Sequence, residues 1–390
     1  MYRIMLVTRI LYAFLLLFAV RDLADQEKIN VLALGSIQLI SILTELNFVN
    51  NSLKTLAPNS KNDPQKFLAY MLFPTTIVTV ILTFFYASTI FGSEHVMLPL
   101  GCAVFIFLQQ MSKIPDICIK LKGLLRTAYT IETFSNIFQI SIVVYLHEVG
   151  LLTTINVLLG MIFAQFTQFL VKSFFKSRIC YQGKYIFGTG LSTRLDFFRP
   201  SIKFSAITFS TTLFVALALP IVAVSLSASD GYFLLLIFRV LTYCDQLSWS
   251  PFYATLPLIH QDFQSDAKNS HSKYFRALNQ VLIYFISLSV ISILVLALPY
   301  VQRLFSYQLT SIGVPLFIIM LLNRVIAMET QILFALTKVE PPYRHLMATL
   351  ASGIIFATDR DYLILSIVVF TVSLINLHFT TLRLIKYQVQ

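Results

Sequence analysis

Long apolar segments separated by short polar loops recur along the whole chain of 390 residues. A helix of about 20 apolar residues crosses the ~30 Å hydrocarbon core of a bilayer, and many of these segments approach that length. The shorter, alternating segments of a transmembrane barrel are absent. The pattern therefore predicts an all-α polytopic membrane protein with about twelve transmembrane helices. We place them approximately at residues 4–20, 30–48, 67–90, 96–112, 128–146, 151–171, 203–227, 232–257, 277–299, 311–335, 345–358 and 362–382.

The composition agrees with this class, because 57% of the residues are hydrophobic and only 12% are charged. A soluble domain carries about 25% charged residues. The first predicted span is short, since only residues 10–20 are free of charge.

The basic residues fall mostly on one side of the predicted membrane. With the N-terminus in the cytoplasm, 23 of the 29 Lys and Arg residues lie in cytoplasmic segments and four lie on the opposite side. Such an excess sets the orientation of membrane proteins. We therefore expect both termini in the cytoplasm, and we interpret the net charge of +11 as a topology signal rather than a nucleic-acid surface.

The longest predicted cytoplasmic loop, at about residues 172–202, separates six spans from six others. We divide the chain there into an N-terminal lobe, residues 1–187, and a C-terminal lobe, residues 188–390. Loops at equivalent places are alike: "IKLKGLLRTAY" follows the fourth span and "ALTKVEPPYRH" follows the tenth. Equivalent loops on the same side predict parallel repeats related by a pseudo-two-fold axis along the membrane normal. The alternative is that short basic loops look alike in any membrane protein.

Sequence motifs of the common enzyme and metal-binding classes are absent. The chain has no phosphate-binding G-x-x-x-x-G-K-[ST] loop, no G-x-S-x-G elbow, and no His or Cys spacing that would hold a metal. We therefore expect no cofactor, no metal site and no enzymatic activity. A membrane glycosyltransferase or polysaccharide polymerase remains an alternative, although the short predicted outer loops disfavour it.

Charged and polar residues lie inside the eighth span, in the stretch "FRVLTYCDQLSWSPFYATLP" at 238–257. A charge in the hydrocarbon costs about 2.5–3.5 kcal/mol, so it normally faces a bundle interior or a water-filled cavity. At 100° per residue, most of the polar side chains fall on one helix face, with Asp245 at its edge. We expect this face to line a cavity; packing against polar faces of other helices is the alternative. The face holds Arg239, Thr242, Tyr243, Gln246, Trp249, Ser250 and Tyr253.

The tenth span carries a second polar group, in which Arg324 and Gln331 share one face and Glu329 points elsewhere. Asp245 and Arg324 each lie about 20 Å from the outer end at 1.5 Å per residue, so we expect them to pair or to flank one site. The predicted substrate-binding residues are Arg239, Tyr243, Gln246, Trp249, Arg324 and Gln331. The predicted coupling or ion-pair residues are Asp245, Glu329, Glu45 and Glu132, of which the last two have an alternative as interfacial groups near Lys54 and Arg126.

With these features, the chain resembles the multidrug/oligosaccharidyl-lipid/polysaccharide exporter superfamily, and it is most similar to the Wzx-type polysaccharide (O-antigen) flippases of bacteria. The resemblance covers nearly the whole chain. It rests on the six-plus-six arrangement and on four stretches: "ISILTELNFVNNSLKTLA", "LKGLLRTAYTIETFSNIFQI", "RPSIKFSAITFSTTLFV" and "PFYATLPLIHQ".

The resemblance implies two six-helix lobes that form a V around a cationic central cavity, and alternating access between the two sides of the bacterial inner membrane. The implied cargo is an oligosaccharide on an undecaprenyl pyrophosphate carrier, moved for surface polysaccharide biosynthesis. Arg239 and Arg324 match the family's cavity basic residues by location, and a guanidinium suits phosphate oxygens. H⁺ or Na⁺ coupling and a polysaccharide polymerase are the further implied partners. A cation-coupled drug or metabolite exporter of the same superfamily is the alternative.

Overall fold

The structure is a computed structural model, and all regular structure in its described residues is helical. The chain divides into two compact units, Met1–Ile202 and Lys203–Gln390. The predicted lobe boundary at 187/188 lies outside the described residues. These are residues 2–44, 48–49, 52, 65–92, 96–179, 195–198, 223, 230–244, 247–248, 267–304 and 375.

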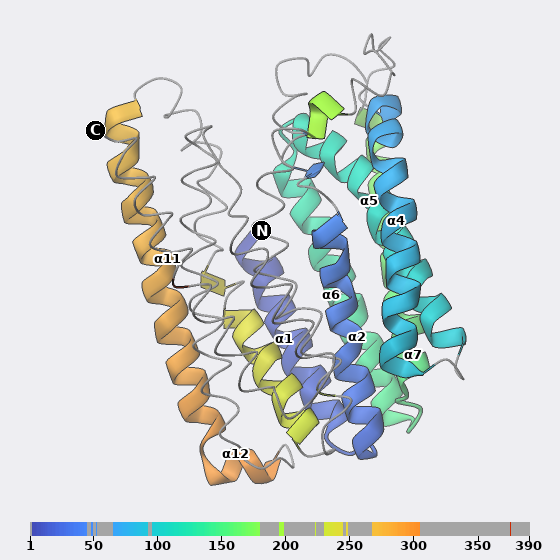
Figure 1. Cartoon of the computed structure of the whole chain (residues 1–390), viewed down its shortest axis with the longest axis vertical. Coiled ribbons are helices and arrows are strands. Elements are labelled where there is room, and N and C mark those ends of the chain that lie inside the picture. The colour runs from blue at the N-terminus through green and yellow to red at the C-terminus, as the bar shows by residue number, and fades with distance from the viewer. Residues whose placement is uncertain are drawn as a thin grey trace. The chain divides into compact units, whose positions relative to one another are not determined.

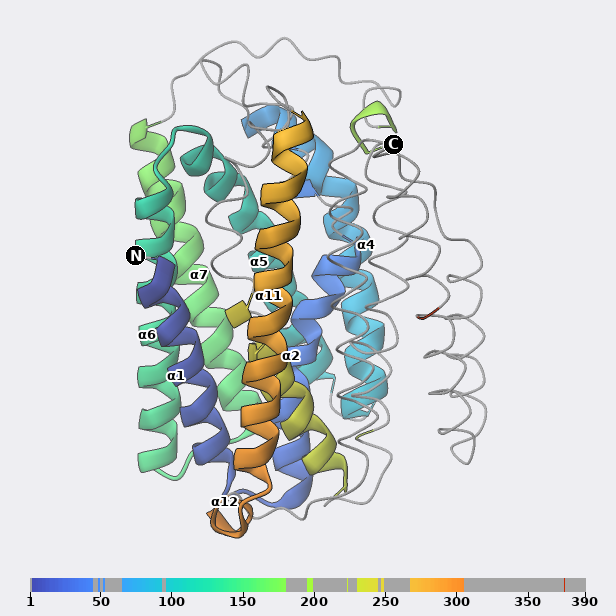
Figure 2. The ribbon, with the colours of Figure 1, turned by 90° about the vertical axis from the view of Figure 1, so that its left-hand side faces the viewer.

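In the first unit, helices run side by side in a bundle (Figures 1 and 2). Neighbouring pairs are α1 with α6, α6 with α7, α7 with α5, α5 with α4, and α4 with α2. Because α5 and α7 each pack against several others, they form the centre of this unit. The helices are α1 (Tyr2–Val20), α2 (Asp25–Thr44), α4 (Gln65–Phe91), α5 (Met97–Leu121), α6 (Leu125–Glu148) and α7 (Thr154–Ile179).

The described part of the second unit holds the helix of residues 230–244, the long α11 (Ala267–Leu296) and the short α12 (Pro299–Leu304). The 230–244 helix approaches α11 through the Cys244 thiol, which lies 3.3 Å from the Ser292 hydroxyl. The all-α class is confirmed for the described residues, while the count of twelve helices and the two-lobe repeat remain predictions.

Several helices are longer than the apolar segments that predicted them. The first was expected to be short, but α1 has 19 residues. Helix α5 continues to Leu121 and α7 to Ile179, beyond the predicted ends at 112 and 171. The predicted spans end just before Lys113 and Lys172, because they include only apolar segments. The helical backbone continues past both lysines.

Glycines mark where α5 and α6 stop. Gly123 and Gly150 have φ angles of +76° and +67°, a left-handed conformation that a residue without Cβ adopts at low cost. After α5, the Gly123 N–H donates to the Lys120 carbonyl and the Leu124 N–H to that of Ile119. This is the Schellman arrangement, in which terminal carbonyls gain partners as the chain turns away. The same pair of bonds recurs around Gly150.

Helix α4 buries threonine side chains and exposes several of its large apolar side chains. Phe73 and Phe85 are 60% and 64% exposed, while Thr79 and Thr83 are fully buried. Each of these threonine hydroxyls donates to a carbonyl one turn earlier, at 2.5 and 2.7 Å. An apolar exterior with self-satisfied polar groups inside is the arrangement that a lipid environment requires.

Three described helical stretches are long and apolar enough to cross a membrane: Phe67–Phe91, Met97–Leu121 and Thr154–Lys176. Three such helices in one unit agree with the predicted multi-pass membrane protein. Its orientation and the identity of the membrane remain predictions.

The turn between α1 and α2 carries an exposed ion pair outside the spans. The Arg21 guanidinium donates to Asp22 at 2.8 and 3.0 Å, and this hydrogen bonding holds the pKa of the Asp22 carboxyl below its ordinary value. The lowered pKa means that the pair stabilises the turn at neutral pH and loses this effect as the pH falls through the pKa. Because both groups are open to solvent, the contribution is small.

Candidate functional site

Four charged side chains meet between α5, α6 and α7, and we call them the charged cluster: Asp116 and Lys120 from α5, Glu132 from α6 and Lys172 from α7. The Lys172 ammonium lies 2.6 Å from an Asp116 oxygen and 3.4 Å from a Glu132 oxygen. The other Asp116 oxygen lies 2.6 Å from the Lys120 ammonium. The four groups form a chain of alternating charge whose net charge is zero when all are ionised.

The cluster is withdrawn from solvent. The side chains of Lys172 and Asp116 are 4% and 11% exposed, and those of Glu132 and Lys120 are 15% and 19% exposed. A buried charge destabilises the folded protein unless it is paired with an opposite charge and hydrogen-bonded. The cluster therefore ties three helices together at one end of the first unit.

Local sequence explains part of this geometry. Asp116 and Lys120 are four residues apart, so they face each other across one helical turn. Pro115 precedes Asp116 inside α5 and removes one backbone hydrogen bond, which favours a bend in the helix there. Hydropathy did not predict Asp116, Lys120 or Lys172 as site residues, because all three lie beyond the predicted span ends at 112 and 171. The i,i+4 spacing of Asp116 and Lys120 was the signal that could have found one pair.

Glu132 is a predicted coupling or ion-pair residue whose alternative was an interfacial position near Arg126. In the structure it lies on α6 within reach of Lys172, a residue 40 positions further along the chain. This contact places Glu132 in the charged cluster; a coupling role for it remains a prediction.

A second buried polar layer lies further along α5. The Gln165 amide of α7 donates to the Ser112 hydroxyl at 3.0 Å, and both side chains are buried. Gln110 is also fully buried, and neither atom of its side-chain amide has a hydrogen-bond partner in the described structure. A buried amide without partners costs about 1–3 kcal/mol.

The Gln110→Leu variant is expected to raise the stability of the protein by about 1–2 kcal/mol, because leucine fills similar space without an unsatisfied amide. Gln165→Leu is the matched control and is expected to lower stability by about 1 kcal/mol, since it removes a formed hydrogen bond. Thermal unfolding of both variants in detergent measures the difference. A Gln110→Leu protein less stable than Gln165→Leu would contradict this interpretation.

In the second unit, the helix of residues 230–244 has a buried apolar majority and a more open polar face. Residues 232–238 are all at most 3% exposed. Arg239, Thr242 and Tyr243 are only half-buried, and their spacing of three and four residues puts them on one face. The Thr242 hydroxyl donates to the Phe238 carbonyl at 2.8 Å, within the helix. Arg239 and Tyr243 are therefore partly exposed on one face of this helix; their contact with a substrate remains a prediction.

The other predicted site residues lie outside the described residues. These are Glu45, Asp245, Gln246, Trp249, Arg324, Glu329 and Gln331. Within the part that the structure describes, no three His, Cys, Asp or Glu side chains gather as a metal site would require.

Solved structures of transporters share the architecture of this chain. An inward-facing multidrug resistance MATE family transporter of the MOP superfamily matches 97% of this chain and 94% of its own, with a TM-score of 0.64 and 12% identity. The lipid II flippase MurJ, in an inward closed conformation, matches 97% of this chain and 87% of its own, with a TM-score of 0.61 and 15% identity. The chain shares the fold of these transporters.

A MOP superfamily transporter from Pyrococcus furiosus, for which reverse polarity of the binding pocket suggests a different function, also matches. It covers 100% of this chain and 94% of its own, with a TM-score of 0.60 and 14% identity. The sequence matches no family model and no curated protein. This shared fold agrees with the resemblance in architecture, whereas superfamily membership, the Wzx-type relationship and the cargo remain proposals.

Proposed function

We propose that the chain is a flippase that moves an undecaprenyl-pyrophosphate-linked oligosaccharide across the bacterial inner membrane for surface polysaccharide biosynthesis. Alternating access would carry the polar head past the bilayer core, while the prenyl chain stays in lipid. No covalent step is needed, only two conformations that bind the cargo at one site.

The observation that carries this proposal is the half-buried Arg239 on a helix whose neighbouring residues are buried and apolar. A guanidinium at that position offers paired N–H donors to a pyrophosphate group. Tyr243, one turn further on, adds an aromatic ring and a hydroxyl suited to a sugar. The shared fold supports the proposal because a lipid II flippase also has it.

A cation-coupled drug or metabolite exporter is the second candidate. The similarity to a multidrug resistance MATE family transporter favours it, since its TM-score of 0.64 is no lower than that of MurJ. H⁺ or Na⁺ coupling through Asp245, Glu329, Glu45 or Glu132 fits either candidate. The charge of the cargo separates them, because a cavity arginine attracts an anionic carrier and repels a cationic drug.

Arg239→Ala is expected to reduce surface polysaccharide at least about tenfold, since the loss of a charged hydrogen-bonding group costs about 1.5–3 kcal/mol. Lipid-linked oligosaccharide should then accumulate in the inner leaflet. The measurement is complementation of a strain that lacks this gene, with membrane levels of the variant matched by immunoblot. Arg303→Ala, at an exposed arginine of α12, is the control and should complement fully.

Full complementation by an Arg239→Ala, Arg324→Ala double variant would contradict the cargo site. Lost cation-drug resistance in the deletion strain, with unchanged polysaccharide, would instead support the exporter.

A further inference from the structure

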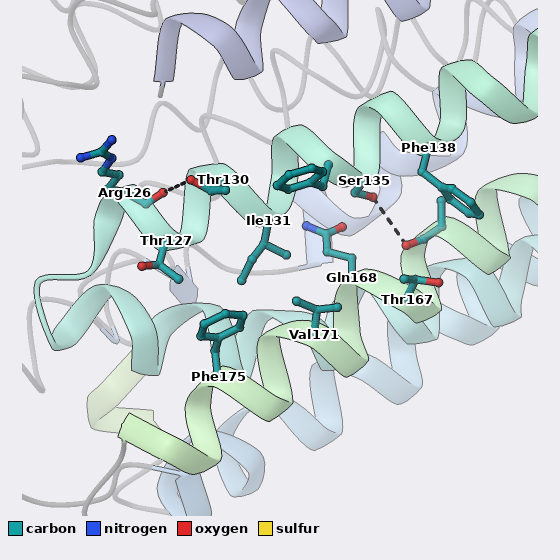
Figure 3. Close-up of a pocket in the computed structure, with 12 residues that line it drawn as sticks. Arg126, Thr127, Thr130, Ile131, Ser135, Phe138, Thr167, Gln168, Val171 and Phe175 are labelled. Atoms are coloured by element: carbon teal, nitrogen blue, oxygen red, sulfur yellow. Dashed lines mark hydrogen bonds between the residues drawn. The ribbon is translucent and has the colours of Figure 1, made fainter.

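A groove of about 600 Å³ lies between α6 and α7 in the first unit, and its lining includes none of the four residues of the charged cluster. Figure 3 shows Arg126 at one end of the groove and Phe138 at the other, with Ile131 and Val171 between the helices. From Arg126 to Phe138 is twelve residues, or about 18 Å along α6. This length is close to half of the ~30 Å hydrocarbon core, which is the depth of one leaflet.

The groove has four hydroxyl-bearing residues, and three of their hydroxyls donate to backbone carbonyls. Thr130 donates to the Arg126 carbonyl at 2.8 Å, and Thr167 donates to the Phe163 carbonyl at 2.9 Å. Ser135 reaches the Ala164 carbonyl at 3.5 Å. Since these oxygens bond to backbone, they are less available to a ligand. The aromatic residues Phe134 and Phe175, which are 67% and 37% exposed, complete a largely hydrocarbon wall.

The mouth of the groove is cationic. Arg126 is exposed, and its guanidinium makes no ion pair or hydrogen bond within the described part of the chain. It lies in the first turn of α6, where Leu124 at the N-cap supplies no side-chain hydrogen bond to the free N–H groups. The partial positive charge of the helix end therefore adds to that of Arg126. The carboxylates on the facing helix turns, Asp116 and Glu132, are paired with lysines in the charged cluster.

One polar side chain enters the groove below this mouth. Gln168 extends from α7 into the space between Ile131 and Ser135 (Figure 3), and Ile131 itself is roughly 7.5 Å beyond Arg126 along α6. An amide at this depth, between a cationic mouth and an aromatic wall, matches the order of groups in a phospholipid. That order is phosphate, then ester carbonyl, then acyl chain.

From this arrangement we propose that the α6–α7 groove binds one anionic glycerophospholipid from the leaflet at the Arg126 end. Its phosphate contacts Arg126, an ester carbonyl accepts from Gln168, and an acyl chain lies along Phe134 and Phe138. The occupant is a membrane phospholipid rather than the prenyl chain of a cargo, because the groove is one leaflet long and an eleven-unit prenyl chain is longer.

The test uses the purified full-length chain in detergent, titrated with phosphatidylglycerol or with phosphatidylcholine of the same acyl chains. Native mass spectrometry counts bound lipid, and thermal unfolding reports stabilisation. We expect tighter binding of phosphatidylglycerol. Arg126→Gln should weaken that binding about fivefold, since one basic residue near an anionic headgroup contributes about that factor. The Arg303→Gln control, on exposed α12, should bind as the unchanged protein does.

A second variant tests the wall of the groove. Phe134→Ser changes an exposed side chain, so the protein should fold, and binding of both lipids should weaken. Equal affinity for the two lipids in the unchanged protein would overturn the proposal. Equal stabilisation by inorganic phosphate would also contradict the proposal, because it would show that Arg126 binds an anion without any acyl chain. Binding of undecaprenyl phosphate in preference to phosphatidylglycerol would assign the groove to cargo. None of these measurements depends on flipping activity, so they stand apart from the proposed function.

Discussion

Lys172→Met is expected to destabilise the protein by about 3–5 kcal/mol, the cost typical of removing one partner from a buried ion pair. The Lys172 ammonium lies between Asp116 and Glu132, at 2.6 and 3.4 Å, and its side chain is only 4% exposed. Without it, two carboxylates share the site with Lys120 alone. The measurement is thermal unfolding in detergent, together with the yield of monodisperse protein.

Lys176→Met is the matched control, because Lys176 lies one turn further along α7 and makes no ion pair in the described residues. It should change stability by no more than about 0.5 kcal/mol. A Lys172→Met, Glu132→Gln double variant completes a cycle whose coupling energy measures the contact between the two residues. Equal stability of the Lys172→Met and Lys176→Met proteins would show that the charged cluster does not hold these helices.

Gly160→Ala is expected to destabilise the protein by about 1–3 kcal/mol through overpacking. A Cβ atom at Gly160 of α7 would lie 2.6 Å from the Cγ2 methyl of Ile142 on α6. Because Ile142 is β-branched, it cannot easily rotate that methyl away within a helix. Small residues allow such close helix approach in membrane proteins.

Gly101→Ala provides the comparison, since its Cβ would meet the Leu158 Cδ2 methyl at 2.8 Å. That methyl is the tip of a flexible side chain, and alanine gains about 1 kcal/mol of helix propensity over glycine, so little net change is expected. Ile142→Leu removes the obstructing branch and should rescue Gly160→Ala. Unfolding temperatures of the single and double variants test this, and a Gly160→Ala protein as stable as Gly101→Ala would rule out the steric account.

Hydropathy predicted where helices occur, because a bilayer forces each crossing segment to be long, apolar and internally hydrogen-bonded. It did not predict where they end. Lys120 and Lys172 lie beyond the predicted span ends, since basic residues usually lie outside the membrane, yet both are helical and paired with acids. Gly123 and Gly150 were the better end signals, because a left-handed residue closes a helix whatever the charge around it.

The charged cluster could not be assembled from sequence for a different reason. Asp116, Glu132 and Lys172 come from three helices, and their meeting depends on how those helices pack and on their rotation about their axes. When a helix is apolar on most sides, its hydrophobic pattern does not predict which side faces its neighbours. The polar face with Arg239 and Tyr243 was easier to recognise, since a single helix carries it.

The zero net charge of the charged cluster bears on how the membrane potential can act on this protein. Moving one elementary charge through 100 mV involves about 2.3 kcal/mol of electrical work. Two lysines and two carboxylates that move together contribute almost none, so moving the end of the first unit that holds them requires almost no electrical work. Any voltage sensitivity of the proposed transport would then arise from uncompensated charges elsewhere on the moving parts, from a coupling ion, or from the cargo itself.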